Sequence, residues 1–67
     1  RPEIMAVLEG LIIDKLVDSA RADYTSYDAR SKQIRINRYI DQAVSSFGAD
    51  RKTILARLSE EGIFMDR

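Results

Sequence analysis

The sequence FGADRKTILARLSEEGIF, residues 47–64, decides the fold of this chain. Gly48 follows an apolar residue, and glycine readily adopts the left-handed conformation in which a helix ends. Asp50 is a good N-cap, because its carboxylate can accept hydrogen bonds from the free N–H groups of the next turn. Ile54 and Leu58 then lie four residues apart, as on the inner face of a helix. The pattern predicts two helices joined by a three-residue turn, which is the layout of a helix-turn-helix.

The segment before the turn also has a helical pattern. Apolar residues recur at spacings of three and four from about residue 34, at Ile36, Tyr39, Ile40, Ala43, Val44 and Phe47. We therefore assign residues 34–64 to the helix-turn-helix. The sequence QIRIN, residues 33–37, also alternates apolar and polar residues, which is compatible with a short strand.

A long N-terminal helix is predicted from Pro2 to Ala22. Proline suits a first helical position, since its missing N–H would be unpaired there. Eleven of the first twenty residues are apolar, too many for a single stripe facing one core. We expect a second copy of the chain to cover part of this surface, through Met5, Leu8, Ile12, Ile13, Leu16 and Ala20.

Glu9 falls inside this apolar arc, where a carboxylate is costly unless it is paired. It could form an ion pair between helices or subunits, with Arg35 or Arg38. Alternatively, it could lie at the edge of an interface, with its carboxylate in water.

The polar segment 23–33 contains no proline or glycine and is predicted to be a connector, either a loop or a short helix. Sixty-seven residues then form one small all-α bundle, near the lower size limit for a core that folds unaided. Such a chain often gains burial by dimerising or as part of a longer protein. The first residue is Arg1 rather than methionine, which favours an excised domain or a processed chain.

The formal net charge is zero, but the charges are segregated along the chain. Residues 1–29 carry three basic and six acidic side chains, residues 30–57 seven and two, and residues 58–67 one and three. The net charges of these segments are therefore −3, +5 and −2. Neutrality argues against indiscriminate binding of polyanions, whereas the basic middle segment allows a localised contact with phosphate.

Residues 40–63, IDQAVSSFGADRKTILARLSEEGI, resemble the C-terminal helix-turn-helix of the factor for inversion stimulation and of bacterial enhancer-binding activators. That family combines an alanine-containing helix, an apolar-glycine turn, a polar cap, an Arg-Thr-Leu core and a closing Leu-x-x-x-Gly-apolar. The corresponding residues here are Ala43, Phe47, Gly48, Asp50, Arg51, Thr53, Ile54, Leu58, Gly62 and Ile63. The chain departs from the family at Glu60 and Glu61, where lysines are common, and at Val44, where alanine is typical.

The resemblance implies a dimeric DNA-binding regulator. Arg51, Lys52, Leu55 and Ala56 would face the major groove, where arginine can bond guanine and an apolar side chain can touch a thymine methyl. The residues expected to hold phosphates, which position the protein without reading sequence, are Thr53, Arg57, Arg35 and Arg38. A two-fold dimer would present its second helices to half-sites about 34 Å apart.

Other classes of protein are less well supported by the sequence. There is no histidine or cysteine and no glycine-rich phosphate loop, so we expect no enzyme activity, metal or cofactor. Neither a membrane span nor a signal peptide is recognised, which favours a cytoplasmic protein. Two alternatives to DNA binding remain: a protein-interaction domain with a similar fold, and a ribbon-helix-helix repressor that uses residues 33–37 as its strand.

Overall fold

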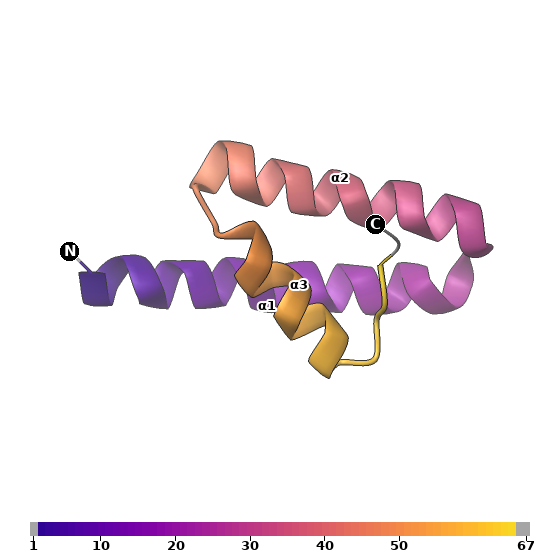
Figure 1. Cartoon of the computed structure of the whole chain (residues 1–67), viewed down its shortest axis with the longest axis horizontal. Helices are drawn as coiled ribbons and strands as arrows, with labels where there is room; N and C mark the ends of the chain where they lie inside the picture. The colour runs from indigo at the N-terminus through magenta and orange to yellow at the C-terminus, as the bar shows by residue number, and fades with distance from the viewer. Residues whose placement is uncertain (1, 66–67) are drawn as a thin grey trace.

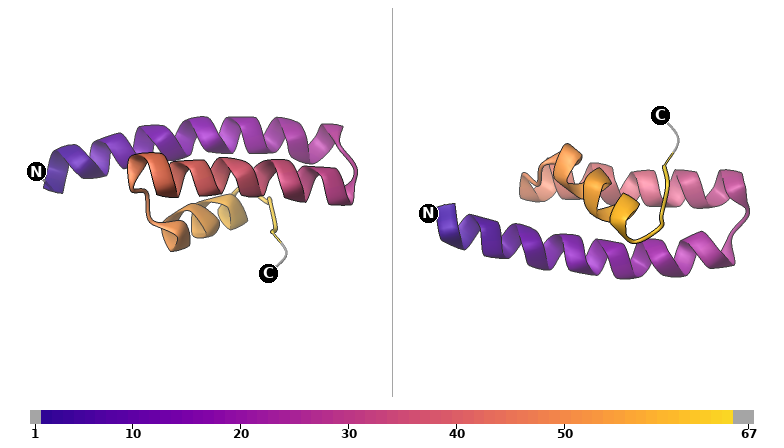
Figure 2. Two further views of the ribbon diagram at one scale, coloured as in Figure 1. Left: turned by 90° about the horizontal axis from the view of Figure 1, so that it is seen from above. Right: turned by 60° about the horizontal axis from the view of Figure 1, so that its bottom comes forward.

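Three helices form the molecule: α1 (Pro2–Ser26), α2 (Ala29–Phe47) and α3 (Arg51–Glu60). The computed structural model describes the backbone of residues 2–65 and the side chains of residues 3, 4 and 6–65. α1 and α2 run antiparallel, side by side, and α3 lies across one face of this pair (Figures 1 and 2). The molecule is elongated, 40 × 20 × 18 Å. Its length follows from α1, because 25 residues at 1.5 Å each give a helix of about 37 Å.

The connection between α1 and α2 is much shorter than expected. α1 continues to Ser26 and α2 begins at Ala29, so the predicted end at Ala22 and the connector 23–33 are wrong. Asp28 caps the start of α2, because its carboxylate accepts a hydrogen bond from the Ser31 N–H at 2.8 Å. The polar side chains that made this segment look like a loop instead form the Asp28 cap and contacts between α1 and α2, such as that of Asp23 with Arg35.

The possible strand at residues 33–37 is also absent, because these residues lie within α2. Ile36 is fully buried against the other helices, and the polar residues around it lie on the exposed or half-exposed sides of α2. Residues 2–65 contain no β-strand, so the arrangement required for a ribbon-helix-helix is not present.

All three helices contribute to one hydrophobic core. α1 supplies Ile13, Leu16, Val17 and Ala20, and α2 supplies Ile36, Ile40 and Ala43. The remaining members come from the turn, from α3 and from the segment after it: Ala49, Ile54, Leu58 and Ile63. α3 thus contributes just two buried side chains, both on the face that it turns toward α1 and α2.

The turn between α2 and α3 agrees with the sequence-based prediction. Gly48 adopts a left-handed conformation (φ 71°), and its N–H donates to the Val44 carbonyl at 3.1 Å, which closes the end of α2. Asp50 caps α3 by accepting hydrogen bonds from the Thr53 N–H at 3.1 Å and the Thr53 hydroxyl at 2.8 Å. Ala49 is buried beneath the turn. Both the glycine end of α2 and the aspartate cap of α3 are confirmed.

In residues 2–65, no helix is both long enough and apolar enough to cross a lipid bilayer.

Candidate nucleic-acid interface

The first turns of α3 carry five of the residues assigned to DNA contact. Ile54 and Leu58 point into the core, so the rest of the helix surface is left to solvent. The exposed residues among the candidates are Arg51, Lys52, Thr53, Leu55 and Ala56. They lie within the first six residues of α3. In helix-turn-helix proteins the N-terminal part of the recognition helix contacts base edges.

Arg51 forms an ion pair with Asp41 of α2, with 2.5 Å between Arg51 Nη2 and Asp41 Oδ1. The two side chains are 48% and 66% exposed, and an ion pair this exposed to water contributes little to stability. Arg51 can therefore exchange Asp41 for another anion. Lys52 and Arg38 form no ion pair with any residue between 2 and 65.

Arg57 lies on the inner flank of α3 and is less exposed than Arg51. Its guanidinium contacts Asp14 of α1 at 2.8 Å and Glu61 at 3.4 Å. The hydrogen bond with Asp14 is the main reason that the pKa of Arg57 is raised above its usual value. Glu61 also accepts a hydrogen bond from Arg21 of α1. Arg57 therefore ties α3 to α1, and its guanidinium would have to leave Asp14 and Glu61 to bind a phosphate.

Arg35 is held at the contact between α1 and α2, away from the α3 cluster. Its Nε donates to Asp23 at 2.9 Å, and its guanidinium stacks on the Tyr27 ring at 4.4 Å from the centroid. Asp23 is only 8% exposed and also accepts a hydrogen bond from the Tyr39 hydroxyl. These two donors, Tyr39 first, lower the pKa of Asp23 despite its burial. Arg35 serves to balance a buried carboxylate.

Glu9 has a role that the sequence did not indicate. Its Oε2 accepts a hydrogen bond from the backbone N–H of Asp50 at 2.9 Å. Among the described residues neither Arg35 nor Arg38 pairs with it, so the ion pair, one of the two possibilities for Glu9, is not formed. A carboxylate at this place stabilises the N-terminus of α3, because the free N–H groups there carry partial positive charge. Glu9 thus fixes the turn to α1.

The residues assigned to dimerisation divide into two groups. Ile13, Leu16 and Ala20 are buried inside the chain, because α2 and α3 cover them. Ile12 is half-buried and Leu8 is exposed, and the side chain of Met5 lies outside the described residues. In this arrangement, just part of the predicted set is available to a second copy.

No group of three or more acidic, histidine or cysteine side chains within residues 2–65 is arranged to hold a metal ion. The chain matches no known protein family, no curated protein and no solved structure.

Proposed function

We propose that this chain is a DNA-binding domain of the helix-turn-helix type that acts as a homodimer. One observation carries the proposal: the turn at Gly48–Asp50 places the first turn of α3 at the surface, with the side chains of Arg51 and Lys52 exposed. This combination of an exposed helix start and two adjacent cations suits insertion into the major groove of duplex DNA.

The neighbouring residues suggest how α3 would bind. Lys52, which forms no ion pair among the described residues, would contact DNA directly. Arg51 would exchange Asp41 for a phosphate or a guanine edge. Leu55 and Ala56 follow on the exposed side of the helix and can touch thymine methyl groups. The Thr53 hydroxyl already donates to Asp50, so Thr53 orders the start of α3.

The acidic end of α3 is partly neutralised. Glu61 is contacted by Arg21 and Arg57, so its charge is balanced within the chain. Glu60 remains at the C-terminal end, whereas a helix-turn-helix reads bases mainly with the N-terminal part of its second helix. The negative charge thus lies away from the expected contact.

Binding to a labelled duplex, measured by fluorescence anisotropy over a range of salt concentrations, tests the proposal. Lys52→Ala and Arg51→Ala should each weaken binding and reduce the salt dependence by about one phosphate contact. Arg30→Ala removes an exposed cation at the start of α2 and is the matched control, for which we expect little change. A wild-type chain that leaves the duplex unbound at low salt, or an equal loss in Arg30→Ala, would refute the proposal.

A protein-interaction domain without DNA contact is the second candidate. The observation that favours it is that Arg35, Arg51 and Arg57 are all paired with carboxylates of the same chain. A chain that dimerises but does not bind the duplex in the same assay would support this second candidate.

A further inference from the structure

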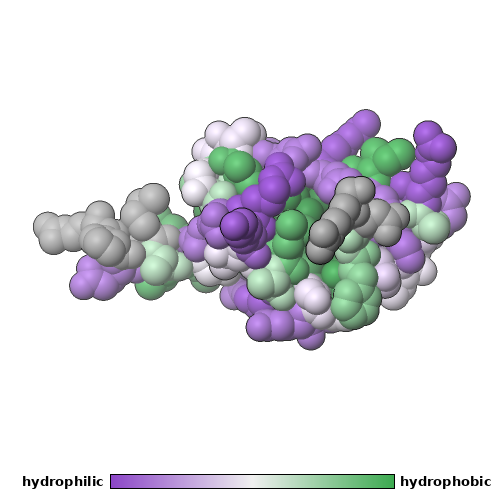
Figure 3. Space-filling view, viewed as in Figure 1, coloured by the Kyte–Doolittle hydropathy of each residue, from purple (hydrophilic) through white to green (hydrophobic). Residues whose placement is uncertain are grey.

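The N-terminal part of α1 is apolar on the side that the rest of the chain leaves uncovered. α1 extends beyond the end of α2, so its first turns project from the body (Figures 1 and 2). Hydrophobic side chains are visible on these projecting turns in the space-filling view (Figure 3). The exposed large apolar residues here are Ile4, Val7, Leu8 and Leu11, which we call the α1 stripe. Projecting apolar helices of this kind mark sites of association.

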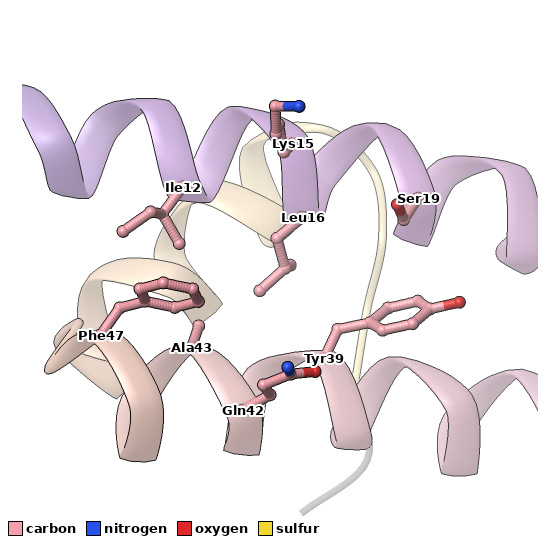
Figure 4. Close-up of a pocket in the computed structure, with 8 residues that line it drawn as sticks. All are labelled: Ile12, Lys15, Leu16, Ser19, Tyr39, Gln42, Ala43 and Phe47. Carbon is pink, nitrogen blue, oxygen red and sulfur yellow. The ribbon is translucent and has the colours of Figure 1, made fainter.

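A groove lies next to the α1 stripe, between α1 and α2. It is lined mainly by apolar side chains and opens on the side away from α3, which lies behind the two helices in Figure 4. Ile12 and Leu16 form its α1 wall, and Ala43 and Phe47 form its α2 wall. Its volume of about 260 Å³ is below the 300–1,000 Å³ typical of small-molecule sites. We call it the α1–α2 groove.

The packing around α1 and α2 is one-sided. α3 fills one of the two grooves that an antiparallel helix pair offers, and the α1–α2 groove is the other. Residues 4–12 supply an apolar helical face next to it, and Phe47, also exposed, borders both surfaces. A helix laid in this groove would complete a four-helix arrangement.

We propose that the occupant is the α1 stripe of a second copy of this chain, with each copy placing its first turns in the groove of the other. The inference concerns the dimer named in the proposed function, and it stands or falls independently of DNA binding. The two copies of α1 then run antiparallel, with residues 3–11 of each beside residues 12–19 of its partner.

Reciprocal docking fixes this direction. If each copy places its first turns beside residues 12–19 of the other, the two copies of α1 must run antiparallel. The charges alone do not set the direction, because residues 3–11 carry Glu3 and Glu9 and residues 12–19 carry Asp14, Lys15 and Asp18. Lys15 is the one charged residue that lines the groove, so it is the cation there that can meet an acidic side chain of the partner.

The size of the molecule favours reciprocal docking. A specific dimer buries about 800 Å² per partner, roughly a sixth of the 4884 Å² accessible surface of this chain. The α1 stripe alone offers a partner only one face of two to three helical turns. Using both the stripe and the groove of each copy doubles the number of contacts, which is how so small a chain could reach this area.

The first test is the solution mass, measured by sedimentation equilibrium over a range of concentrations. Leu8→Glu places a charge in the stripe, at a side chain that is 49% exposed and outside the core. Ile34→Glu is the matched control, because Ile34 is 46% exposed on α2 and does not line the groove. We expect Leu8→Glu to raise the dimer dissociation constant on the order of thirtyfold, as for a central interface residue, and Ile34→Glu to leave it unchanged.

The second test uses cysteine cross-linking, which is unambiguous because the chain has no cysteine. Leu11→Cys lies near the two-fold axis of the antiparallel pair and should form a disulfide with its own copy. Ile4→Cys should not, because the two copies of residue 4 would be about 15 residues apart along the helix direction, roughly 22 Å.

Each outcome bears on the inference. A wild-type chain that stays monomeric at high concentration overturns it, whether or not DNA is bound. A dimer that survives Leu8→Glu overturns the choice of surface. Cross-linking of Ile4→Cys as efficient as that of Leu11→Cys overturns the antiparallel direction.

Discussion

Two glycine-to-alanine substitutions should change stability in opposite directions. Gly48 has φ 71°, a conformation that costs an L-residue about 1–2 kcal/mol, and a Cβ added there meets no atom within 4 Å. The penalty in Gly48→Ala therefore comes from the backbone alone. Gly10 lies within α1, where alanine is a better helix former by about 0.8–1 kcal/mol, and a Cβ there also meets nothing within 4 Å.

Urea unfolding followed by circular dichroism at 222 nm measures both effects at a fixed protein concentration. The free energy of unfolding should fall by about 1–2 kcal/mol in Gly48→Ala and rise by up to about 1 kcal/mol in Gly10→Ala. The same changes correspond to Tm shifts of about 4–8 °C per kcal/mol in a chain of this size. Since neither site is crowded, steric clashes cannot explain a difference in sign. A Gly48→Ala variant as stable as the wild type would show that α2 does not end in the left-handed conformation.

Four other substitutions test the packing and the ion pairs. Leu58→Ala, at a fully buried residue, should lower the free energy of unfolding by about 2–5 kcal/mol, whereas Leu55→Ala, on the exposed side of α3, should cost less than about 1 kcal/mol by the same denaturant assay. The pKa of Asp23 is lowered in the folded chain, so its contribution to stability is present above its ordinary pKa of 3.8 and is lost as the pH falls through the folded value. Asp23→Asn should therefore flatten the loss of stability that thermal unfolding measures below about pH 4. Asp41→Asn frees Arg51 and should tighten binding to duplex DNA at low salt by roughly two- to fivefold in the anisotropy assay, and an unchanged affinity would show that Arg51 does not contact the DNA.

The sequence predicted the turn between α2 and α3 well because the signals there are local. Gly48 and Asp50 act on groups no more than a few residues away, the Val44 carbonyl and the Thr53 N–H. Such contacts depend on neighbouring residues alone. The all-α fold followed from the same kind of information, since the apolar spacing around Ile36 and Ile40 reports a helix without reference to the rest of the chain.

The sequence failed where the deciding contact joins distant residues. Asp23 looked like the start of a polar connector, but Arg35 and Tyr39, 12 and 16 residues later, satisfy it inside the helix pair. Glu9 and the Asp50 N–H are 41 residues apart, so the cap that Glu9 provides could not be read from its spacing. Periodicity shows that a residue lies on an apolar face but does not identify the surface that covers it.

The dimer residues show the same limit and also connect the two proposals. The predicted apolar arc of α1 was assigned to a second copy, yet its C-terminal part, Ile13, Leu16 and Ala20, is covered by the chain's own α2 and α3. What remains uncovered is the N-terminal stripe and the groove beside it, on the side of the helix pair opposite α3. Docking there would leave both copies of α3 exposed, with Arg51 and Lys52 free to reach DNA. A dimer built through the α3 face would instead bury those two side chains, so the position of the groove makes dimerisation and DNA binding compatible in one small chain.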